Sequence, residues 1–498
     1  MSLLLYANVR PNMEPAFAPD DVFTRMPMST ADTPTPTRPA DARLFDPDLI
    51  RRYDKSGPRY TSYPTAVQFH DEFGEAQYRA AARRSNAVGG PLSLYLHVPF
   101  CDTVCYYCAC NKVVTKDRSR AQPYVDDVIR ELALQAPLFD AGRPVDQLHW
   151  GGGTPTFLSE EQMRAIMQAT GRHFELKTDD TGEYSIEIDP READAHTIAV
   201  LRELGFNRIS LGVQDFDPTV QKAVNRIQSL AETRAVVDAA RAEAFHGVSL
   251  DLIYGLPFQS RDSFLRTLDT VIDMAPDRLS IFNYAHLPTR FKPQRRINTE
   301  DLPSAAEKLA ILGGSIERLQ EAGYVLIGMD HFARPDDPLA IAQRNGTLHR
   351  NFQGYSTHAE CDMVAVGVSA ISQVGDAFSQ NTKDLEVYHE AVSAGRLPIE
   401  RGYVLTPEDH IRRFVIVSLI SHFQLDFDAV TQRFGIDVPS HFATALAQLL
   451  PMADDGLVRL SPNRIEVLPR GRLLIRNICM AFDEYLNPEG LQRFSRVI

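Results

Sequence analysis

Between residues 92 and 333 the chain alternates short apolar runs with stretches of helical pattern, and this alternation restricts its fold more than any other feature. The apolar runs predict strands at 92–98, 147–150, 184–189, 208–214, 249–254, 279–284 and 324–329. The stretches between them predict helices at 122–138, 159–173, 194–204, 230–244, 261–274 and 304–322. Gly205 and Gly323 stand where a helix should end and the next strand begin. The pattern predicts an α/β fold with parallel strands and right-handed crossovers, in a barrel or an open sheet.

The segments on either side differ in character. Residues 1–47 hold eight of the 32 prolines, a density that predicts a flexible extension without regular structure. After residue 375, helices are expected at 408–421, 428–434, 441–450 and 470–482, with a small hairpin over 457–468. We therefore predict four parts: the extension, an N-terminal segment over 48–91, a barrel domain over 92–375 and a mostly helical, winged-helix-like domain over 376–498.

Charge and hydropathy exclude several classes of protein. The 498 residues include 52 Lys and Arg against 65 Asp and Glu, a net charge of −13. Phosphate contacts need clustered basic residues, so the balance argues against nucleic-acid binding, including by the winged-helix-like domain. No apolar run approaches the roughly 18 residues that span a bilayer, and the start lacks a secretory signal. A cytoplasmic protein without membrane contact is expected.

Four of the six cysteines, Cys101, Cys105, Cys108 and Cys110, fall within ten residues just after a predicted strand. A structural zinc site usually takes two separated pairs of ligands, and no second pair follows. Buried free cysteines are the plainer alternative, but such a dense group is improbable by chance. The C-x3-C-x2-C spacing favours an iron–sulfur cluster with three thiolate ligands, which leaves one iron open for chemistry.

Further polar residues stand at or near the ends of successive predicted strands, where α/β barrels place their sites. They are Glu187, Gln214 and Asp251, and Ala285 stands at a corresponding place. A glycine run, 151–153, would let the backbone approach a ligand, although a plain glycine turn is the alternative. Arg226 could bind a carboxylate or form an ordinary surface ion pair, and Asp251 alone could cap a strand end.

The cysteine spacing, with Tyr107 before the third cysteine, resembles the radical S-adenosylmethionine (SAM) superfamily. Further motifs make the chain similar to the oxygen-independent coproporphyrinogen III oxidase family from about residue 48 to 498. The motifs are Pro58–Thr65, Trp150–Thr156, Phe206–Arg208, Gly212–Phe216, Asp251–Pro257, Asn283–Pro288, Gly328–Phe332 and Arg493–Ile498. The resemblance implies a partial (β/α) barrel, a C-terminal winged-helix-like domain, and an N-terminal segment that covers the substrate site.

The resemblance also implies a role for each matching residue. Cys101, Cys105 and Cys108 would ligate a [4Fe-4S] cluster, and Cys110 would act in the reaction without being a ligand. Two SAM molecules are implied. Residues that contact the SAM on the cluster would be Tyr95, Gly152, Glu187 and Ile371. Residues around the second SAM would be Gly153, Thr154, Gln214, Arg226, Asp251 and Ala285.

The implied activity is the anaerobic conversion of two propionate groups of coproporphyrinogen III to vinyl groups, giving protoporphyrinogen IX. It needs an electron donor of flavodoxin or ferredoxin type, and the family resemblance favours a monomer. Candidate partners for the substrate carboxylates are Arg59, Arg290, Arg295, Arg296 and Arg350, although each is more simply a surface charge.

Two rival interpretations use the same scaffold. One is a haem-binding chaperone, although such relatives usually carry an aromatic residue where this chain has Cys110. The other is a radical SAM enzyme with a different substrate.

Overall fold

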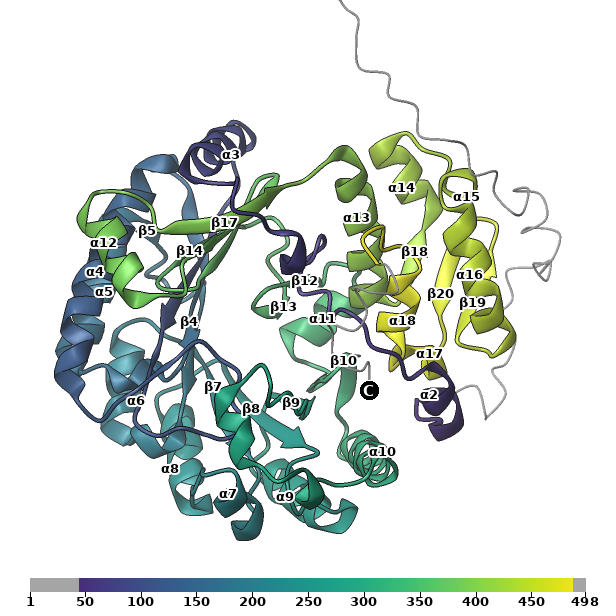
Figure 1. Cartoon of the computed structure of the whole chain (residues 1–498), viewed down its shortest axis with the longest axis horizontal. Helices are drawn as coiled ribbons and strands as arrows, with labels where there is room; N and C mark the ends of the chain where they lie inside the picture. The colour runs from purple at the N-terminus through teal and green to yellow at the C-terminus, as the bar shows by residue number, and fades with distance from the viewer. Residues whose placement is uncertain (1–43, 487–498) are drawn as a thin grey trace, which may run out of the picture.

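The computed structural model describes residues 44–486 and shows two parts, a large sheet covered by helices and a smaller, mostly helical unit (Figure 1). Only residues 44–47 of the predicted extension are described. The motif at 493–498 lies outside the described residues.

The centre of the sheet is parallel, as predicted. Its adjacent strands are β1 (Leu92–Val98), β4 (Pro144–Gly152), β6 (Glu183–Ile188), β7 (Arg208–Gln214), β8 (Gly247–Tyr254) and β9 (Arg278–Asn283). The short β5 (Glu175–Leu176) pairs with β4. Among residues 44–486 no pairing joins the two end strands of the sheet, so the barrel is partial and open. The expected α/β fold is confirmed.

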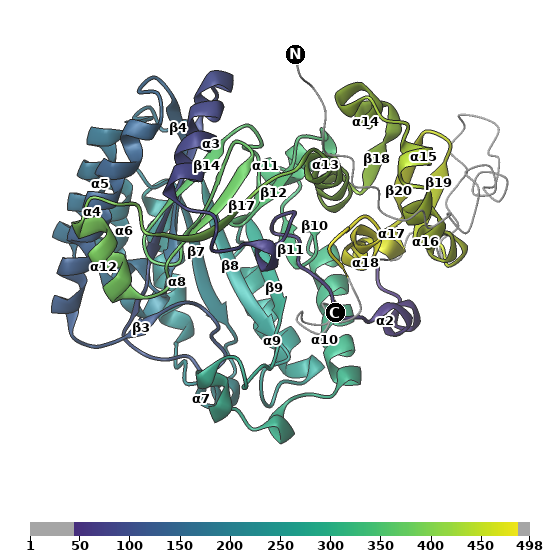
Figure 2. The same cartoon turned by 45° about the horizontal axis from the view of Figure 1, so that its top comes forward.

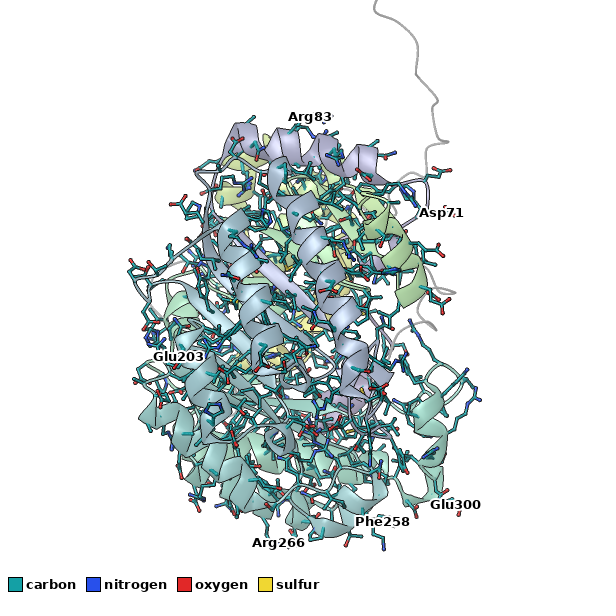
Figure 3. All side chains as sticks on the ribbon, turned by 90° about the vertical axis from the view of Figure 1, so that its left-hand side faces the viewer. Asp71, Arg83, Glu203, Phe258, Arg266 and Glu300 are labelled. Carbon is teal, nitrogen blue, oxygen red and sulfur yellow. The ribbon has the colours of Figure 1, made fainter. Side chains whose placement is uncertain are left out.

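Helices cover the outer side of this sheet (Figures 1 and 2). They are α4 (Ala121–Gln135), α5 (Glu160–His173), α6 (Ala195–Glu203), α8 (Leu230–Ala242), α9 (Arg261–Asp273) and α10 (Ala305–Glu321). Several begin at a side-chain cap; the Ser159 hydroxyl, for example, accepts from the backbone N–H of Gln162. Their outer faces carry exposed charged residues, including Glu203 and Arg266 (Figure 3). The apolar faces pack on the sheet and form the main core.

The last predicted barrel strand does not continue the parallel series. Strand β10 (Val325–Gly328) pairs antiparallel with β11 (His331–Ala333), which lies between β10 and β9. The cause is a tight turn at Met329 and Asp330, in which Met329 takes a φ of 51°. The chain therefore reverses its direction directly after the last predicted barrel strand.

Residues 334–404, for which no elements were predicted, extend the sheet beyond β1. After α11 (Pro338–Arg344) and the hairpin β12 (His349–Asn351) and β13 (Gly354–Ser356), strand β14 (Asp362–Val366) pairs parallel with β1. Antiparallel strands β15 (Ile371–Val374), β16 (Ala377–Asn381) and β17 (Ile399–Val404) follow, with α12 (Leu385–Ser393) packed on α4. The sheet thus continues past residue 375 to residue 404.

The C-terminal unit combines helices with a three-stranded wing. Its helices are α13 (Pro407–His422), α14 (Phe427–Phe434), α15 (Val438–His441), α16 (Ala443–Asp454), α17 (Pro469–Arg472) and α18 (Ile475–Met480). The wing contains β18 (Gln424–Asp426), β19 (Val458–Ser461) and β20 (Arg464–Val467) in the order β18-β20-β19. The single helix predicted over 470–482 is wrong, because Leu473 and Leu474 separate two short helices.

The N-terminal segment joins both parts. Helix α2 (Pro47–Tyr53) places Leu49 and Tyr53 in the core of the C-terminal unit. Helix α3 (Glu75–Val88) packs instead on β15 and β16 of the sheet. None of the helices described between residues 44 and 486 combines the length and apolar character that crossing a bilayer requires.

Candidate functional site

The four clustered cysteines lie on the loop that follows β1, at the carboxyl edge of the parallel strands. Short strands β2 (Phe100–Cys101) and β3 (Val113–Val114) pair with each other at the two ends of the loop. Residues after α7 (Pro218–Ala223) hold its middle: the N–H of Tyr106 donates to the carbonyl of Val224 at 2.9 Å. The Asn225 side chain donates to the carbonyl of Val104 at 2.8 Å. The loop is therefore fixed by backbone contacts as well as by its ends.

Most of the predicted site residues line one cavity of about 200 Å³. It is lined by Cys101, Cys105, Cys108, Cys110, Gly152, Gly153, Thr154, Glu187, Gln214, Arg226 and Asp251. As whole residues, Cys105 is buried and Cys110 is exposed. Three thiols facing a single small cavity are a donor set that suits an iron–sulfur cluster, so the residues fit the implied group.

Three of the predicted residues do not line this cavity. Tyr95 is on β1, where its hydroxyl lies 3.1 Å from Nδ1 of His97 and its ring stacks on His149. Ile371, on β15, packs beside an apolar cluster that includes Phe69. Ala285 lines a second, larger cavity.

The glycine run packs against the cysteine loop itself. The N–H of Gly153 donates to the carbonyl of Val98 at 2.7 Å, and the N–H of Thr154 donates to that of Phe100 at 2.8 Å. A Cβ at residue 153 would lie 2.7 Å from the same Phe100 oxygen. The N–H groups of residues 153 and 154 are therefore bound to the cysteine loop. Glycine is needed at residue 153 because the two backbones touch there.

Glu187 on β6 and Asp251 on β8 differ in their ionisation. A Glu187 oxygen accepts from the Gly152 N–H at 3.1 Å, and the other lies 3.5 Å from Nε2 of His149. Burial alone would raise the pKa of Glu187, but these contacts lower it below its usual value. Burial raises the pKa of Asp251 to about 6, although Ser210 donates to it at 3.0 Å. Glu187 is therefore ionised at neutral pH and can bind a cationic group, whereas Asp251 changes its ionisation close to neutral pH.

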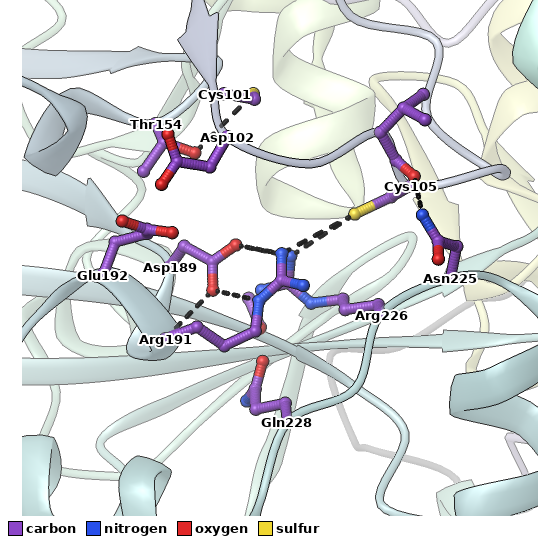
Figure 4. Close-up of polar contacts among 12 residues, drawn as sticks. Cys101, Asp102, Cys105, Thr154, Asp189, Arg191, Glu192, Asn225, Arg226 and Gln228 are labelled. Atoms are coloured by element: carbon purple, nitrogen blue, oxygen red, sulfur yellow. Dashed lines mark hydrogen bonds and ion pairs between the residues drawn. The ribbon is translucent and has the colours of Figure 1, made fainter. Parts of the chain in front are cut away.

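Arg226 is buried, and its guanidinium already contacts other groups of the protein (Figure 4). Its Nη1 lies 2.8 Å from the Asp189 carboxylate and 3.6 Å from the sulfur of Cys105. Its other terminal nitrogen donates to the carbonyl of Gly212. Asp189 also pairs with Arg191 at 2.6 Å. Among the hydrogen bonds of residues 44–486, none involves Nε of Arg226, so one donor of this buried group remains for a ligand.

Sequence reasoning did not single out Asp189, Arg191, His149 or Ser210. The position of Asp189 directly after β6, at the same edge as Glu187 and Gln214, could have indicated that it is a site residue. Arg191 carries no such signal, because its role follows from a contact with Asp189 and with the sulfur of Cys105 at 3.9 Å.

A larger cavity, of about 660 Å³, opens beyond the ends of β8, β9 and β10. The N-terminal segment contributes Ile50 and Arg59, the sheet contributes Tyr254 and Ala285, and the C-terminal unit contributes Arg476. All three parts of the chain therefore meet around it. Of the candidate arginines, Arg59 lines it, whereas Arg290, Arg295, Arg296 and Arg350 do not.

Two family models match the chain. The Radical SAM superfamily matches residues 95–271 and the HemN C-terminal domain matches residues 405–474. The second match begins directly after β17, the last strand of the sheet.

Similar proteins span nearly the whole chain. An oxygen-independent coproporphyrinogen III oxidase of Pseudomonas aeruginosa is 57% identical over 92% of this chain and 100% of its own length. The protein of the same name from Escherichia coli is 50% identical over 91% of this chain and 98% of its own. The solved structure of the Escherichia coli protein, described as a radical SAM enzyme, superposes with a TM-score of 0.85 at 48% identity. It covers 89% of this chain and 99% of that one.

Proposed function

The chain belongs to the oxygen-independent coproporphyrinogen III oxidase family, and we infer from its described residues how it carries out that family's reaction. The enzyme oxidatively decarboxylates coproporphyrinogen III to protoporphyrinogen IX in porphyrin biosynthesis. Each propionate loses a hydrogen atom from its β-carbon, carbon dioxide and one further electron, and becomes a vinyl group. A [4Fe-4S] cluster and SAM, when bound, supply the electron transfer and the hydrogen abstraction that start this reaction.

The strongest support for these residue roles is that Cys101, Cys105 and Cys108 line the same cavity as the strand-end groups. These three thiolates would hold the cluster. Cys110 lines the same cavity, so we assign it to the reaction and not to the ligand set. The hydrogen bonds that join residues 98–101 to residues 153–154 keep the ligand loop in place.

The strand-end groups are suited to bind SAM. Glu187, whose pKa is lowered, offers a carboxylate to an ammonium group, with Gly152 beside it. We assign Tyr95, Gly152, Glu187 and Ile371 to the SAM on the cluster.

A second SAM would lie on the Arg226 side of the cavity. There Arg226 keeps one N–H donor for a carboxylate, and Asp251 can accept from ribose hydroxyls. We assign Gly153, Thr154, Gln214, Arg226, Asp251 and Ala285 to this molecule. Ala285 would then mark the passage from the smaller cavity to the larger one.

We place the tetrapyrrole in the larger cavity. Its volume of about 660 Å³ lies within the range of small-molecule sites. It is lined by apolar residues such as Leu309 and Leu312 and by cationic ones such as Arg59. The segment over 48–91, which supplies Arg59, would cover the substrate as the sequence predicts.

We propose that the enzyme is monomeric and cytoplasmic and that it receives electrons from a donor of flavodoxin or ferredoxin type. The net charge of −13 supports the absence of nucleic-acid partners.

The test is anaerobic reconstitution with iron and sulfide, followed by reduction and an assay of protoporphyrinogen formed per SAM consumed. Product in this assay supports the oxidase. Bound haem without product from a fully reconstituted and reduced enzyme would instead support the haem-chaperone alternative.

A further inference from the structure

Lys308, in the first turns of α10, points into the larger cavity over a glycine. Gly255, just after β8, has a φ of +86°, and a Cβ there would lie 2.7 Å from Cε of Lys308. The absence of a side chain at residue 255 is therefore what lets the lysine stem pass. The Nζ group donates to the carbonyl of Tyr284 at 3.2 Å, which fixes it beside Ala285.

The described residues supply Lys308 with no counter-charge. Its ammonium has three donors, and a single hydrogen bond to a backbone carbonyl is found among residues 44–486. Burial lowers its pKa below the usual value, and no carboxylate of the described chain acts against that effect. A partly buried cation without a partner is unfavourable by itself, because its hydration is lost without replacement.

Two other cations of the same cavity are already paired. Arg59 lies 2.8 Å from the carboxylate of Asp330, and Arg51 lies 2.7 Å from that of Asp48. Lys308 differs from both because a ligand carboxylate could form an ion pair with it without displacing a carboxylate of the protein. Next to it, Leu309 and Leu312 form an apolar wall suited to a macrocycle.

We propose that Lys308 is the carboxylate anchor of this cavity and binds a propionate group of the tetrapyrrole. The proposal rests on the proposed function, which supplies a ligand with four carboxylates. A second source of the same chemistry is the carboxylate of SAM, since Ala285 is assigned to the second SAM molecule. The experiment therefore measures both ligands.

The test compares cluster-containing wild type with Lys308→Met, which keeps the length of the stem and removes the charge. Binding of coproporphyrin III and of its tetramethyl ester is followed by fluorescence without turnover. SAM stoichiometry and affinity are measured in parallel, and iron content confirms that the cluster is intact. Lys177→Met is the matched control, because Lys177 already has a carboxylate partner in Asp146 at 2.7 Å.

We expect Lys308→Met to weaken coproporphyrin III binding about 10- to 100-fold, the usual effect of losing a hydrogen bond to a charged group. Ester binding and SAM binding should be unchanged, and Lys308→Arg should recover part of the affinity. In turnover, the KM for coproporphyrinogen III should rise more than kcat falls. Lys177→Met should match wild type.

Loss of the second SAM with unchanged porphyrin affinity would overturn the propionate assignment and make Lys308 an anchor for SAM. Equal loss of acid and ester binding would show a structural role and overturn the anchor. Because these measurements need no product, they are independent of the oxidase assay, whose failure would count against the proposed function instead.

Discussion

Arg226 and Asp189 form a buried ion pair, with Nη1 and Oδ2 2.8 Å apart, between the end of β6 and the segment after α7. The same guanidinium lies 3.6 Å from the sulfur of Cys105. The guanidinium that we propose to bind a ligand carboxylate therefore lies beside a cysteine that we propose as a cluster ligand.

Arg226→Ala should weaken the second SAM while the first stays bound. The lost charge-assisted contact should cost about 1.5–3 kcal/mol in affinity. Equilibrium binding of SAM to the cluster-containing enzyme would show one tight site and one weakened site. Arg164→Ala, which removes an exposed pair with Glu160, should change neither site. Two unchanged sites in Arg226→Ala would refute the assignment.

Replacement of Cys101, Cys105 or Cys108 by Ala should remove the cluster and with it all SAM cleavage. Three thiolates are the full ligand set that the chain offers in this cavity, apart from Cys110. Iron and sulfide analysis after anaerobic reconstitution is the measurement. Full iron content with activity in any of the three variants would mean that another residue is the ligand.

Cys110→Ser should separate cluster binding from turnover. The residue lines the cavity but is not assigned as a ligand, so the iron content and the cluster spectrum should stay close to wild type. Formation of protoporphyrinogen per SAM consumed should fall. A variant with wild-type product yield would show that Cys110 has no part in the reaction.

Gly153→Ala should disturb the cysteine loop. Its Cβ would lie 2.7 Å from the backbone oxygen of Phe100, and a backbone atom cannot rotate away as a side chain can. We expect a lower iron content and a lower Tm. Gly142→Ala is the control, because a Cβ at that position meets nothing within 4 Å. Equal iron content in both variants would show that the loop adapts.

Asp251→Asn should stabilise the SAM-free protein at pH 8 and weaken SAM binding. Burial raises the folded-state pKa of Asp251 to about 6, above its ordinary value of 3.8. Protonated Asp251 therefore contributes its full stabilisation of the folded state below about pH 3.8, and this contribution is lost as the pH rises through 6. The variant keeps a neutral group, so it should gain about 1–3 kcal/mol at pH 8 and about a third of that at pH 4.5. Urea unfolding of cluster-free protein at both pH values tests this, and an equal difference at the two would contradict it.

The parallel half of the fold could be predicted from the sequence because its strands are short segments rich in apolar residues that alternate with helical stretches. Strands β1 and β7 match their predicted bounds. The strands after residue 330 could not be found in this way. β12 (His349–Asn351) is short and polar, and β14 gains its stability by pairing with β1, far away in the chain. Such strands depend on their partners more than on their own composition.

The candidate site likewise contains residues that the sequence could predict and residues that it could not. The cysteines were predictable because three ligands to one cluster must lie close together in this type of loop. Glu187, Gln214 and Asp251 followed from the rule that strand ends meet at one edge. Arg191 could not be predicted, because in the sequence it is indistinguishable from any surface arginine. Its importance comes from the buried carboxylate of Asp189, which Arg191 shares with Arg226.

The larger cavity has a consequence for how the enzyme is made. Arg476 donates to the carbonyl of Pro58 at 2.8 Å, and the two residues are separated by 418 positions. Translation proceeds from the N-terminus, so the wall formed by Ile50 and Arg59 is made before the wall formed by Leu473 and Arg476. A nascent chain thus has the cysteine loop long before it has both walls of this cavity. If the cavity holds the tetrapyrrole as we propose, cofactors can be inserted before a substrate can bind.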